Sequence, residues 1–487
     1  MCVRTLALLY ALVALAPVLA SQYYLSPAGD DTGPGSRRRP WRTIARANAA
    51  LQPGDTVSFL PGSYEGCIEP VRSGEAGRPI TFRALQPRSV ILTGGQPADT
   101  YKLCLRLKDR AHIVVEGLDM RPTNGGAWWL LEGCRYITLR DIIAQGGQGV
   151  YVPAQATDCH YCRFERLDVS RALQLDANRH VVGNMFGLNG CTHCVVQDSR
   201  FGKAGHDPFC LWPDCEYNVV RRCVFSCVWG RNFEFFTSPH TLIEQCAITN
   251  GYHGSGSADG RAKLFIWEGI FRHNLIYRNW YQPLTIHAYK YQDMAPFGMI
   301  NSRLYHNTFA LNYESGFEMF DIAEQPDPHM VRGNVLQNNL FAYNDPDGDG
   351  LALNLGASIA PDNRFISNLF FGNAPVRPRS ATPGRFRLPT AAKAVFERPP
   401  RPTPSDQTSS SGTWTASHAL WTWTATTTAC RLAAPPGTPG PRWPSPPAAA
   451  PDARSRSAMR ACSTTATPSP ERLGIWFSSV QPGNGRG

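Results

Sequence analysis

The chain has 487 residues, of which 43% are hydrophobic and 18% charged, and its formal net charge is +10. The basic excess lies wholly in residues 375–487, which hold 14 Lys and Arg against 4 Asp and Glu, whereas the rest of the chain holds 34 of each. A body without net charge has no general attraction to polyanions, so we expect no nucleic-acid partner.

The first 20 residues have the pattern of a signal peptide. Arg4 precedes an apolar run over residues 5–15, and Val18 and Ala20 supply small residues at positions −3 and −1 of a cleavage site. The run is too short to span a membrane, and no later stretch is apolar enough. We therefore expect a secreted protein, extracellular or periplasmic, without a membrane span.

Residues 21–111 are expected to begin a solenoid. Ile44, Ala47 and Leu51 recur at helical spacing, which predicts a short N-terminal cap helix over residues 43–51. Residues 51–66 then read as a turn, a strand and a turn that open the first coil.

Residues 112–374 contain a repeated pattern of short alternating strands. The repeat recurs every 24 to 33 residues, in segments 113–120, 137–144, 195–201, 219–225, 242–248, 271–277, 302–309, 335–341 and 365–371. Most are followed by a turn and a second alternating strand, in segments 149–153, 207–212, 232–237, 262–267, 283–289, 316–322 and 350–355. Alternation of period two means that each strand buries one face. Coils stacked with their strands ~4.8 Å apart would bury these faces as one continuous column. The pattern predicts an all-β, right-handed parallel β-helix that is monomeric.

Two columns of equivalent positions support this interpretation. Each Asn or Cys of the first column stands two residues before an apolar strand residue, as expected for an internal side-chain ladder: Cys223, Cys246, Asn274, Asn307, Asn339 and Asn368. The second column stands at the start of successive coils: Cys134, Cys159, Cys191 and Cys215. The CxxC pairs Cys159/Cys162 and Cys191/Cys194 also allow a zinc site, and disulfides between adjacent coils are a third interpretation.

The N-terminal region resembles a known superfamily. The runs YYLSPAGDDTGPGS, PWRTIARANAALQPGDTVSFLPGSYEG and GRPITFRA, within residues 23–84, are similar to the opening of pectin-lyase-like right-handed β-helix proteins, including many bacterial secreted polysaccharide lyases. With the later coils, the resemblance covers residues 22–374. It implies the fold and suggests polysaccharide as the partner, but that superfamily includes lyases, hydrolases, epimerases and non-catalytic adhesins. In such lyases, Lys or Arg bases and acidic calcium ligands line a groove.

The second strand of the later coils is expected to carry the functional site. If Phe209, Leu211 and Phe317 and their equivalents point inward, the polar residues between them share an outward face. The predicted catalytic residues are Lys263, His287 and Arg231; the predicted substrate-binding residues are Glu234, Glu318, Trp212, Trp267 and Tyr289. Cys210 is expected to point outward as well, and His206 and Asp207 to lie at the margin.

This residue set suits β-elimination on a uronate sugar. A cation neutralises the carboxylate, a Lys or His of lowered pKa removes the C5 proton, and aromatic rings stack on the sugar. Glu234 and Glu318 are too far apart for a retaining hydrolase, so hydrolysis ranks lower. A non-catalytic glycan-binding protein and a uronan epimerase remain the alternatives, because an exposed Lys–Glu pair is often only a surface ion pair.

Two further segments have open interpretations. Residues 345–350 match the start of a calcium loop but lack its final Glu, because Gly356 stands there; the match allows calcium, a turn rich in Asp and Gly explains it as well, and no metal ligand is assigned. Residues 375–487 are rich in Pro, Arg, Ser and Thr, and predict either a disordered tail or an out-of-frame translation of GC-rich DNA.

Overall fold

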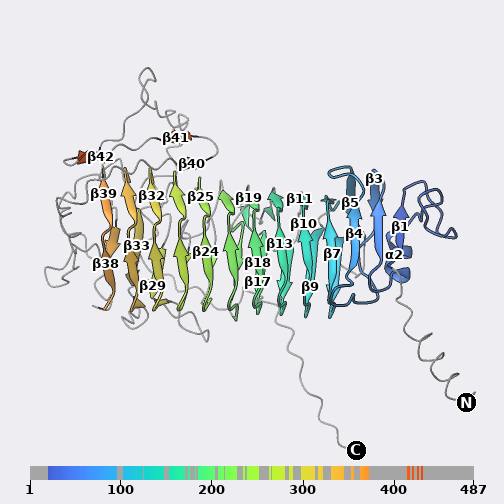
Figure 1. Ribbon diagram of the computed structural model, residues 1–487, viewed down its shortest axis with the longest axis horizontal. Coiled ribbons are helices and arrows are strands. Elements are labelled where there is room, and N and C mark those ends of the chain that lie inside the picture. Colours follow the sequence, from blue (N-terminus) through green and yellow to red (C-terminus); the bar gives the residue numbers. More distant parts are fainter. Residues whose placement is uncertain are drawn as a thin grey trace, which may run out of the picture. The chain divides into compact units, whose positions relative to one another are not determined.

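The computed structural model describes residues 20–95, 102–123, 126–146, 153–170, 185–202, 207–212, 214–226, 238–251, 266–279, 298–312, 316–317, 331–344 and 362–371, and the backbone of short strands outside these ranges. Strands equivalent in successive coils lie side by side and pair in parallel (Figure 1). The described chain is therefore an all-β parallel β-helix, as predicted. No described helix is both long and apolar enough to cross a lipid bilayer.

Three sheets form the walls of the coils. The first sheet comprises β1 (Gln22–Leu25), β2 (Thr56–Phe59), β4 (Ile80–Ala84), β7 (Ile113–Glu116), β10 (Thr138–Arg140), β13 (Arg163–Glu165), β18 (Val195–Gln197), β21 (Val219–Arg221), β24 (Leu242–Glu244), β27 (Ile270–Arg272), β31 (Arg303–Tyr305), β35 (Val335–Gln337) and β38 (Arg364–Ile366). The second sheet comprises β3 (Gly62–Glu65), β5 (Val90–Gly94), β8 (Asp119–Met120), β11 (Ile143–Gln145), β14 (Asp168–Ser170), β19 (Arg200–Gly202), β22 (Val224–Ser226), β25 (Ala247–Thr249), β28 (Leu275–Tyr277), β32 (Thr308–Ala310), β36 (Leu340–Ala342) and β39 (Leu369–Phe371). The third sheet comprises β6 (Leu103–Lys108), β9 (Ala127–Glu132), β12 (Ala154–Thr157), β17 (Phe186–Asn189), β20 (Cys210–Leu211), β23 (Glu234–Phe235), β26 (Lys263–Leu264), β29 (Thr285–Ala288), β33 (Phe317–Asp321) and β37 (Leu353–Leu355).

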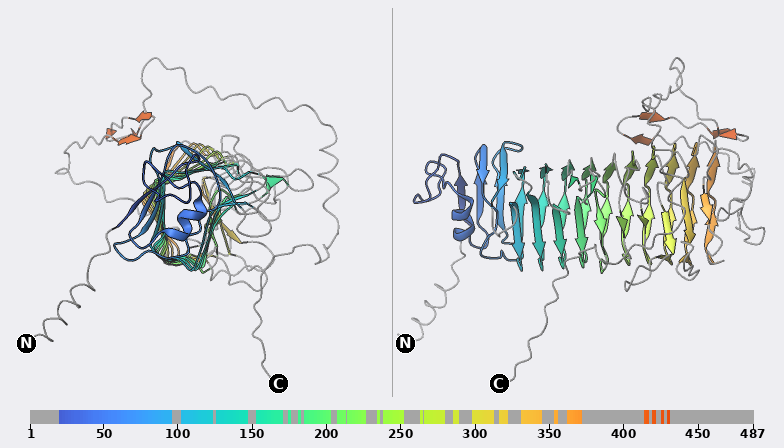
Figure 2. Two further views of the ribbon diagram at one scale, coloured as in Figure 1. Left: turned by 90° about the vertical axis from the view of Figure 1, so that its right-hand side faces the viewer. Right: turned by 180° about the vertical axis from the view of Figure 1, so that it is seen from behind.

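Smaller elements complete the described chain. Helix α2 (Ile44–Ala50) begins after Thr43, whose side chain accepts a hydrogen bond from the Arg46 backbone, and Figure 2 shows it at the N-terminal end of the stack. Ile44 and Ala47 belong to the core cluster, and a capping function for this helix stays a prediction. The remaining strands pair as β15 (Gln174–Leu175) with β16 (Val181–Val182), β30 (Met299–Ile300) with β34 (Val331–Arg332), β40 (Trp414–Ala416) with β41 (Ala419–Trp421), and β42 (Ala425–Thr426) with β43 (Ala429–Cys430).

Each predicted first segment is two strands in the structure. In segment 137–144, β10 ends and β11 begins on either side of Asp141, whose φ is +55°. Asp198 and Arg222 break the equivalent segments with φ of +54° and +52°. A residue in this left-handed region turns the chain, so the two halves enter different sheets.

The core is a column of stacked apolar side chains. Phe209, Leu211 and Phe317, which the sequence places inward, are buried in the core cluster, so this part of the prediction is confirmed. Phe309 stacks on Phe341 with ring centroids 4.8 Å apart, and Phe341 stacks on Phe370 at the same distance. Contact between equivalent rings of adjacent coils is what a solenoid core requires.

The predicted asparagine ladder is present. The Nδ2 of Asn274 donates to the Oδ1 of Asn307 at 3.1 Å, Asn307 donates to Asn339 at 3.0 Å, and Asn339 donates to Asn368 at 2.9 Å. A parallel ladder, absent from the sequence interpretation, runs through Asn279, Asn312 and Asn344.

The predicted cysteine column is buried along the core. The Cys134 thiol donates to the Leu107 carbonyl, the Cys191 thiol to Ala156, and the Cys215 thiol to Leu188, each at 3.4 Å. All described cysteines are free thiols. Three of the four members therefore bond to the backbone of the preceding coil, whereas the Cys159 thiol donates to the Thr157 carbonyl of its own coil at 3.2 Å.

Candidate functional site

One register column crosses the whole third sheet and contains three of the predicted site residues, Glu234, Lys263 and Glu318. We call it the axial column; adjacent members are direct partners in neighbouring strands. Its members are Arg106, Leu130, Gln155, Gly187, Cys210, Glu234, Lys263, Thr285, Glu318 and Asn354. Neighbouring members are separated by one strand spacing, ~4.8 Å.

The backbone brings four predicted site residues to one face. Glu234 and Lys263 are direct partners, and Thr285 separates Lys263 from Glu318. His287 follows two residues after Thr285, so the period of two assigns it to the same face. The structure describes only the backbone at these four positions. Three strand spacings, roughly 14 Å, separate Glu234 from Glu318, more than a glycosidase carboxylate pair allows.

Arg231, Tyr289 and His206 lie outside the described residues, as do residues 345–350 of the calcium-loop match. Within the described residues, no three His, Cys, Asp or Glu side chains come together in a way that could hold a metal ion. Asp207 is fully buried, so in the described structure its carboxylate is not on an open margin.

Trp212 is half-buried at the C-terminal end of β20. Its backbone N–H donates to the Leu188 carbonyl of the preceding coil at 2.8 Å, which anchors the residue beside β17. Its indole lies over Gly187: a Cβ atom built on that glycine would come within 2.5 Å of Cζ3 and 2.8 Å of Cη2. Because Phe186 and Leu188 on either side point into the core, the indole lies on the outer face of the third sheet.

Trp267 differs from its predicted placement, and Cys210 has its predicted register position but is buried. Trp267 lies beyond the end of β26, forms an isolated bridge with Ile300, and packs partly against the core. Its position is therefore in the corner between the third and first sheets. Cys210 keeps the outward register position next to Glu234 but is fully buried and lies outside the core cluster.

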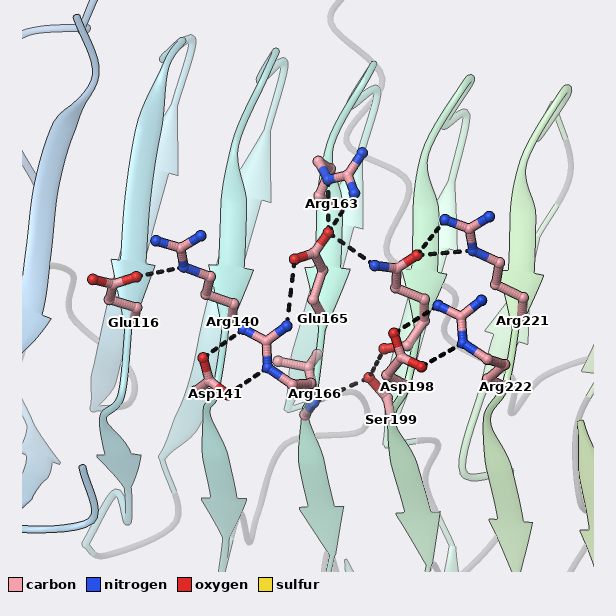
Figure 3. A network of polar contacts seen from close by, with 12 residues as sticks. Glu116, Arg140, Asp141, Arg163, Glu165, Arg166, Asp198, Ser199, Arg221 and Arg222 are labelled. Atoms are coloured by element: carbon pink, nitrogen blue, oxygen red, sulfur yellow. Dashed lines mark hydrogen bonds and ion pairs between the residues drawn. The ribbon is translucent and has the colours of Figure 1, made fainter. Parts of the chain in front are cut away.

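A network of paired charges, which the sequence interpretation did not identify, follows the first sheet and the corner where each coil turns into the second sheet (Figure 3). Arg166 donates to both carboxylate oxygens of Asp141 at 2.6 and 2.7 Å, and Arg222 makes the same fork with Asp198 at 2.6 and 2.8 Å. These bonds lower the pKa of both aspartates, chiefly through the hydrogen bonds from the guanidinium groups. Because the charges neutralise one another, these ion pairs are better suited to holding adjacent coils in register than to binding a charged ligand.

A column of stacked aromatic rings follows the corner between the third and first sheets. Its members are His112, Tyr136, Tyr161, His193, Tyr217 and His240, with successive ring centroids 4.8, 5.2, 4.8, 5.1 and 4.4 Å apart. The tyrosines are nearly half exposed, yet the ring faces inside the stack are covered by their neighbours. Only ring edges reach solvent there, so the interior of this column offers no platform for a sugar ring.

Comparison with known proteins gives local sequence matches. No family model matches the chain. It is 34% identical over 103 residues to the uncharacterized protein YwoF of Bacillus subtilis, a match covering 21% of this chain and 22% of that protein. It is 35% identical over 88 residues to pectate lyase PEL9 of Emericella nidulans, covering 17% and 22%. The chain thus matches about a fifth of the length of these curated relatives. The pectate lyase match supports the resemblance to pectin-lyase-like β-helix proteins.

Several solved structures align with this chain at TM-scores below 0.5. An alginate lyase from Paenibacillus sp. FPU-7 aligns with a TM-score of 0.40 and 14% identity, over 68% of this chain and 96% of that one. A mannuronic-acid-specific polysaccharide family 6 lyase from human gut microbiota aligns at 0.41 and 16% identity, over 72% and 86%. The mannuronan C-5 epimerase AlgE4 A-module of Azotobacter vinelandii aligns at 0.43 and 10% identity, over 62% and 88%.

Proposed function

We propose that this protein is an exported enzyme that cleaves a uronate-containing polysaccharide by β-elimination. The observation that carries the proposal is the axial column, in which Lys263 stands between Glu234 and Thr285, with His287 on the same face by register. A polymer lying across the strands would meet these positions in succession. The local match to a pectate lyase favours a uronate over other glycans.

The residues divide the chemistry as follows. The neutral amine of Lys263 removes the C5 proton, with His287 as the alternative base; burial or a neighbouring cation would lower the pKa of the amine toward neutrality. Arg231 neutralises the uronate carboxylate, which acidifies the C5 proton. The electron pair of the C5–H bond forms the C4–C5 double bond, and the C4–O bond breaks. The leaving oxygen takes a proton from water, and the protonated base returns its proton to the solvent. Glu234 and Glu318 hydrogen-bond sugar hydroxyls.

The test follows the absorbance of the unsaturated product on pectate, alginate and glycosaminoglycans. We expect activity on at least one polymer and its loss in Lys263→Ala, with Lys108→Ala, an exposed third-sheet lysine outside the axial column, as the matched control. Binding to a uronate polymer without product would reject the lyase and leave a glycan-binding protein. Inversion at C5 without chain cleavage, detected by NMR, would instead identify an epimerase, which shares the proton-removal step.

A further inference from the structure

The Trp212 indole occupies space that only a glycine leaves free. In the axial column, the members next to Gly187 are Gln155 and Cys210, and both have a side chain at this register position. At Gly187, three atoms of the six-membered ring lie 2.5, 2.8 and 3.1 Å from the position of a Cβ atom. Contacts shorter than 3 Å exclude any side chain, so the ring could not hold this position over another residue.

The ring also lies on the path that the proposed substrate would take. Gly187 is in β17, and β20, β23 and β26 follow it in the sheet, so the ring is three strand spacings, roughly 14 Å, from the Lys263 position. On its other side is Gln155, half-buried, whose Nε2 donates to Thr157 Oγ1 at 3.1 Å. A flat apolar ring beside a side-chain amide matches a pyranose, which has an apolar ring face and a rim of hydroxyl groups.

We propose that Trp212 and Gln155 form a remote saccharide subsite and that Gly187 is its positioning residue. The indole stacks on one pyranose ring, and the Gln155 amide bonds its hydroxyl groups. This inference rests on the proposed function for the direction of the chain, which runs from Lys263 across the strands toward Gln155. Because of that distance, only oligosaccharides long enough to span three strand spacings reach both regions.

The experiment measures binding of oligouronates of increasing length by calorimetry, in a Lys263→Ala background that prevents turnover. We expect Trp212→Ala and Gly187→Ala each to raise the Kd of the longest oligomers about tenfold, and to change the Kd of a disaccharide less than twofold. Trp212→Phe should retain most of the affinity. The double variant should bind no more weakly than Trp212→Ala alone, because the glycine acts only through the ring.

Gly202→Ala is the matched control. Gly202 is in β19 of the same coil but in the second sheet, and its Cβ would lie 3.0 Å from the Ser226 carbonyl oxygen, far from the indole. If Trp212→Ala binds long oligomers as tightly as this control, the subsite is rejected. If the losses of the two single variants add in the double variant, the positioning by Gly187 is rejected. If Gly187→Ala fails to fold, Trp212→Ala still tests whether the subsite binds saccharide.

A panel of neutral oligosaccharides separates this inference from the proposed function. Trp212-dependent binding of neutral sugars, with no binding of uronates, would overturn the uronate lyase and support the platform. No binding of any saccharide would overturn both. Uronate cleavage that is lost in Lys263→Ala but independent of Trp212 at every substrate length would overturn the subsite alone.

Discussion

Replacement of Asn307 by alanine tests whether the asparagine ladder stabilises the coils. This side chain is 1% exposed and takes part in four hydrogen bonds. Its Nδ2 donates to the Phe271 carbonyl at 2.9 Å and to Asn339 Oδ1 at 3.0 Å. Its Oδ1 accepts from the backbone N–H of Asn274 at 3.0 Å and from Asn274 Nδ2 at 3.1 Å.

The substitution removes these bonds unequally. Asn274 Nδ2 still donates to the Ile243 carbonyl, and Asn339 Oδ1 still accepts a hydrogen bond from the backbone N–H of residue 307. The Asn274 backbone N–H loses its acceptor in a buried position, which costs about 1–3 kcal/mol, and each other lost bond costs about 0.5–1.5 kcal/mol. We therefore expect Asn307→Ala to lower the free energy of unfolding by about 3–5 kcal/mol.

The measurement is urea denaturation followed by far-ultraviolet circular dichroism, with hydrogen exchange to locate the weakened coils. Thr308→Ala, at the next residue of the chain, is the control and should change stability by less than about 0.5 kcal/mol. Because a solenoid is stabilised by contacts between neighbouring coils, exchange should rise most in β27 and β31. Equal stability of the two variants would refute the reasoning.

Three further predictions concern the other columns. Tyr161→Ala removes two ring contacts, at 5.2 and 4.8 Å, and should lower the free energy of unfolding by about 1–3 kcal/mol in the same urea assay; an unchanged midpoint would show that the stack is incidental. Burial raises the pKa of the Cys67 thiol to about 12, so a thiol reagent at pH 8 should label it in urea but hardly in the folded protein, and rapid labelling of folded protein would contradict this. Hydrogen bonds from Arg166 and Arg222 lower the folded-state pKa of Asp141 and Asp198, so their stabilisation is complete above the unfolded pKa of about 3.9 and is lost as the pH falls through the lowered values. The double variant Asp141→Asn/Asp198→Asn should therefore lose less stability on acidification than the wild type, as measured by thermal melts between pH 5 and pH 2. If the Tm of the two proteins falls equally steeply with pH, the pairing does not stabilise the folded protein.

The sequence predicts the features that repeat at every coil. Alternating strands and the column from Asn274 to Asn368 are visible because each coil repeats them at nearly the same offset. The paired charges of Asp141 and Arg166 are not visible in this way, because the two residues are 25 positions apart and the pairing depends on which residues the parallel register aligns. The aromatic column was missed for the same reason, since both His and Tyr occur in it and no single residue type marks the position.

The register positions of the candidate site residues agree with the prediction where the strand is straight and differ where the chain turns. Within β23 and β26, the period of two brings Glu234 and Lys263 into one column, as expected. Beyond the end of β26, the chain turns into the next sheet, and Trp267 pairs with Ile300 instead of continuing that face. Side chains alternate between the inner and outer face only within a strand, and the alternation is lost where the chain turns between sheets. The face on which Trp267 lies therefore could not be predicted from alternation alone.

Gly187 shows a second limit of sequence interpretation. A glycine inside a short strand usually weakens it, and by itself it indicates only that another group approaches closely. The group is an indole that stands 25 positions later in the chain, and only the register of β17 with β20 identifies it. Because the ring and the glycine come from different coils, each is uninformative without the other. The proposed subsite, an indole held over Gly187 in the axial column, therefore requires a substrate path that crosses the strands rather than one that follows them.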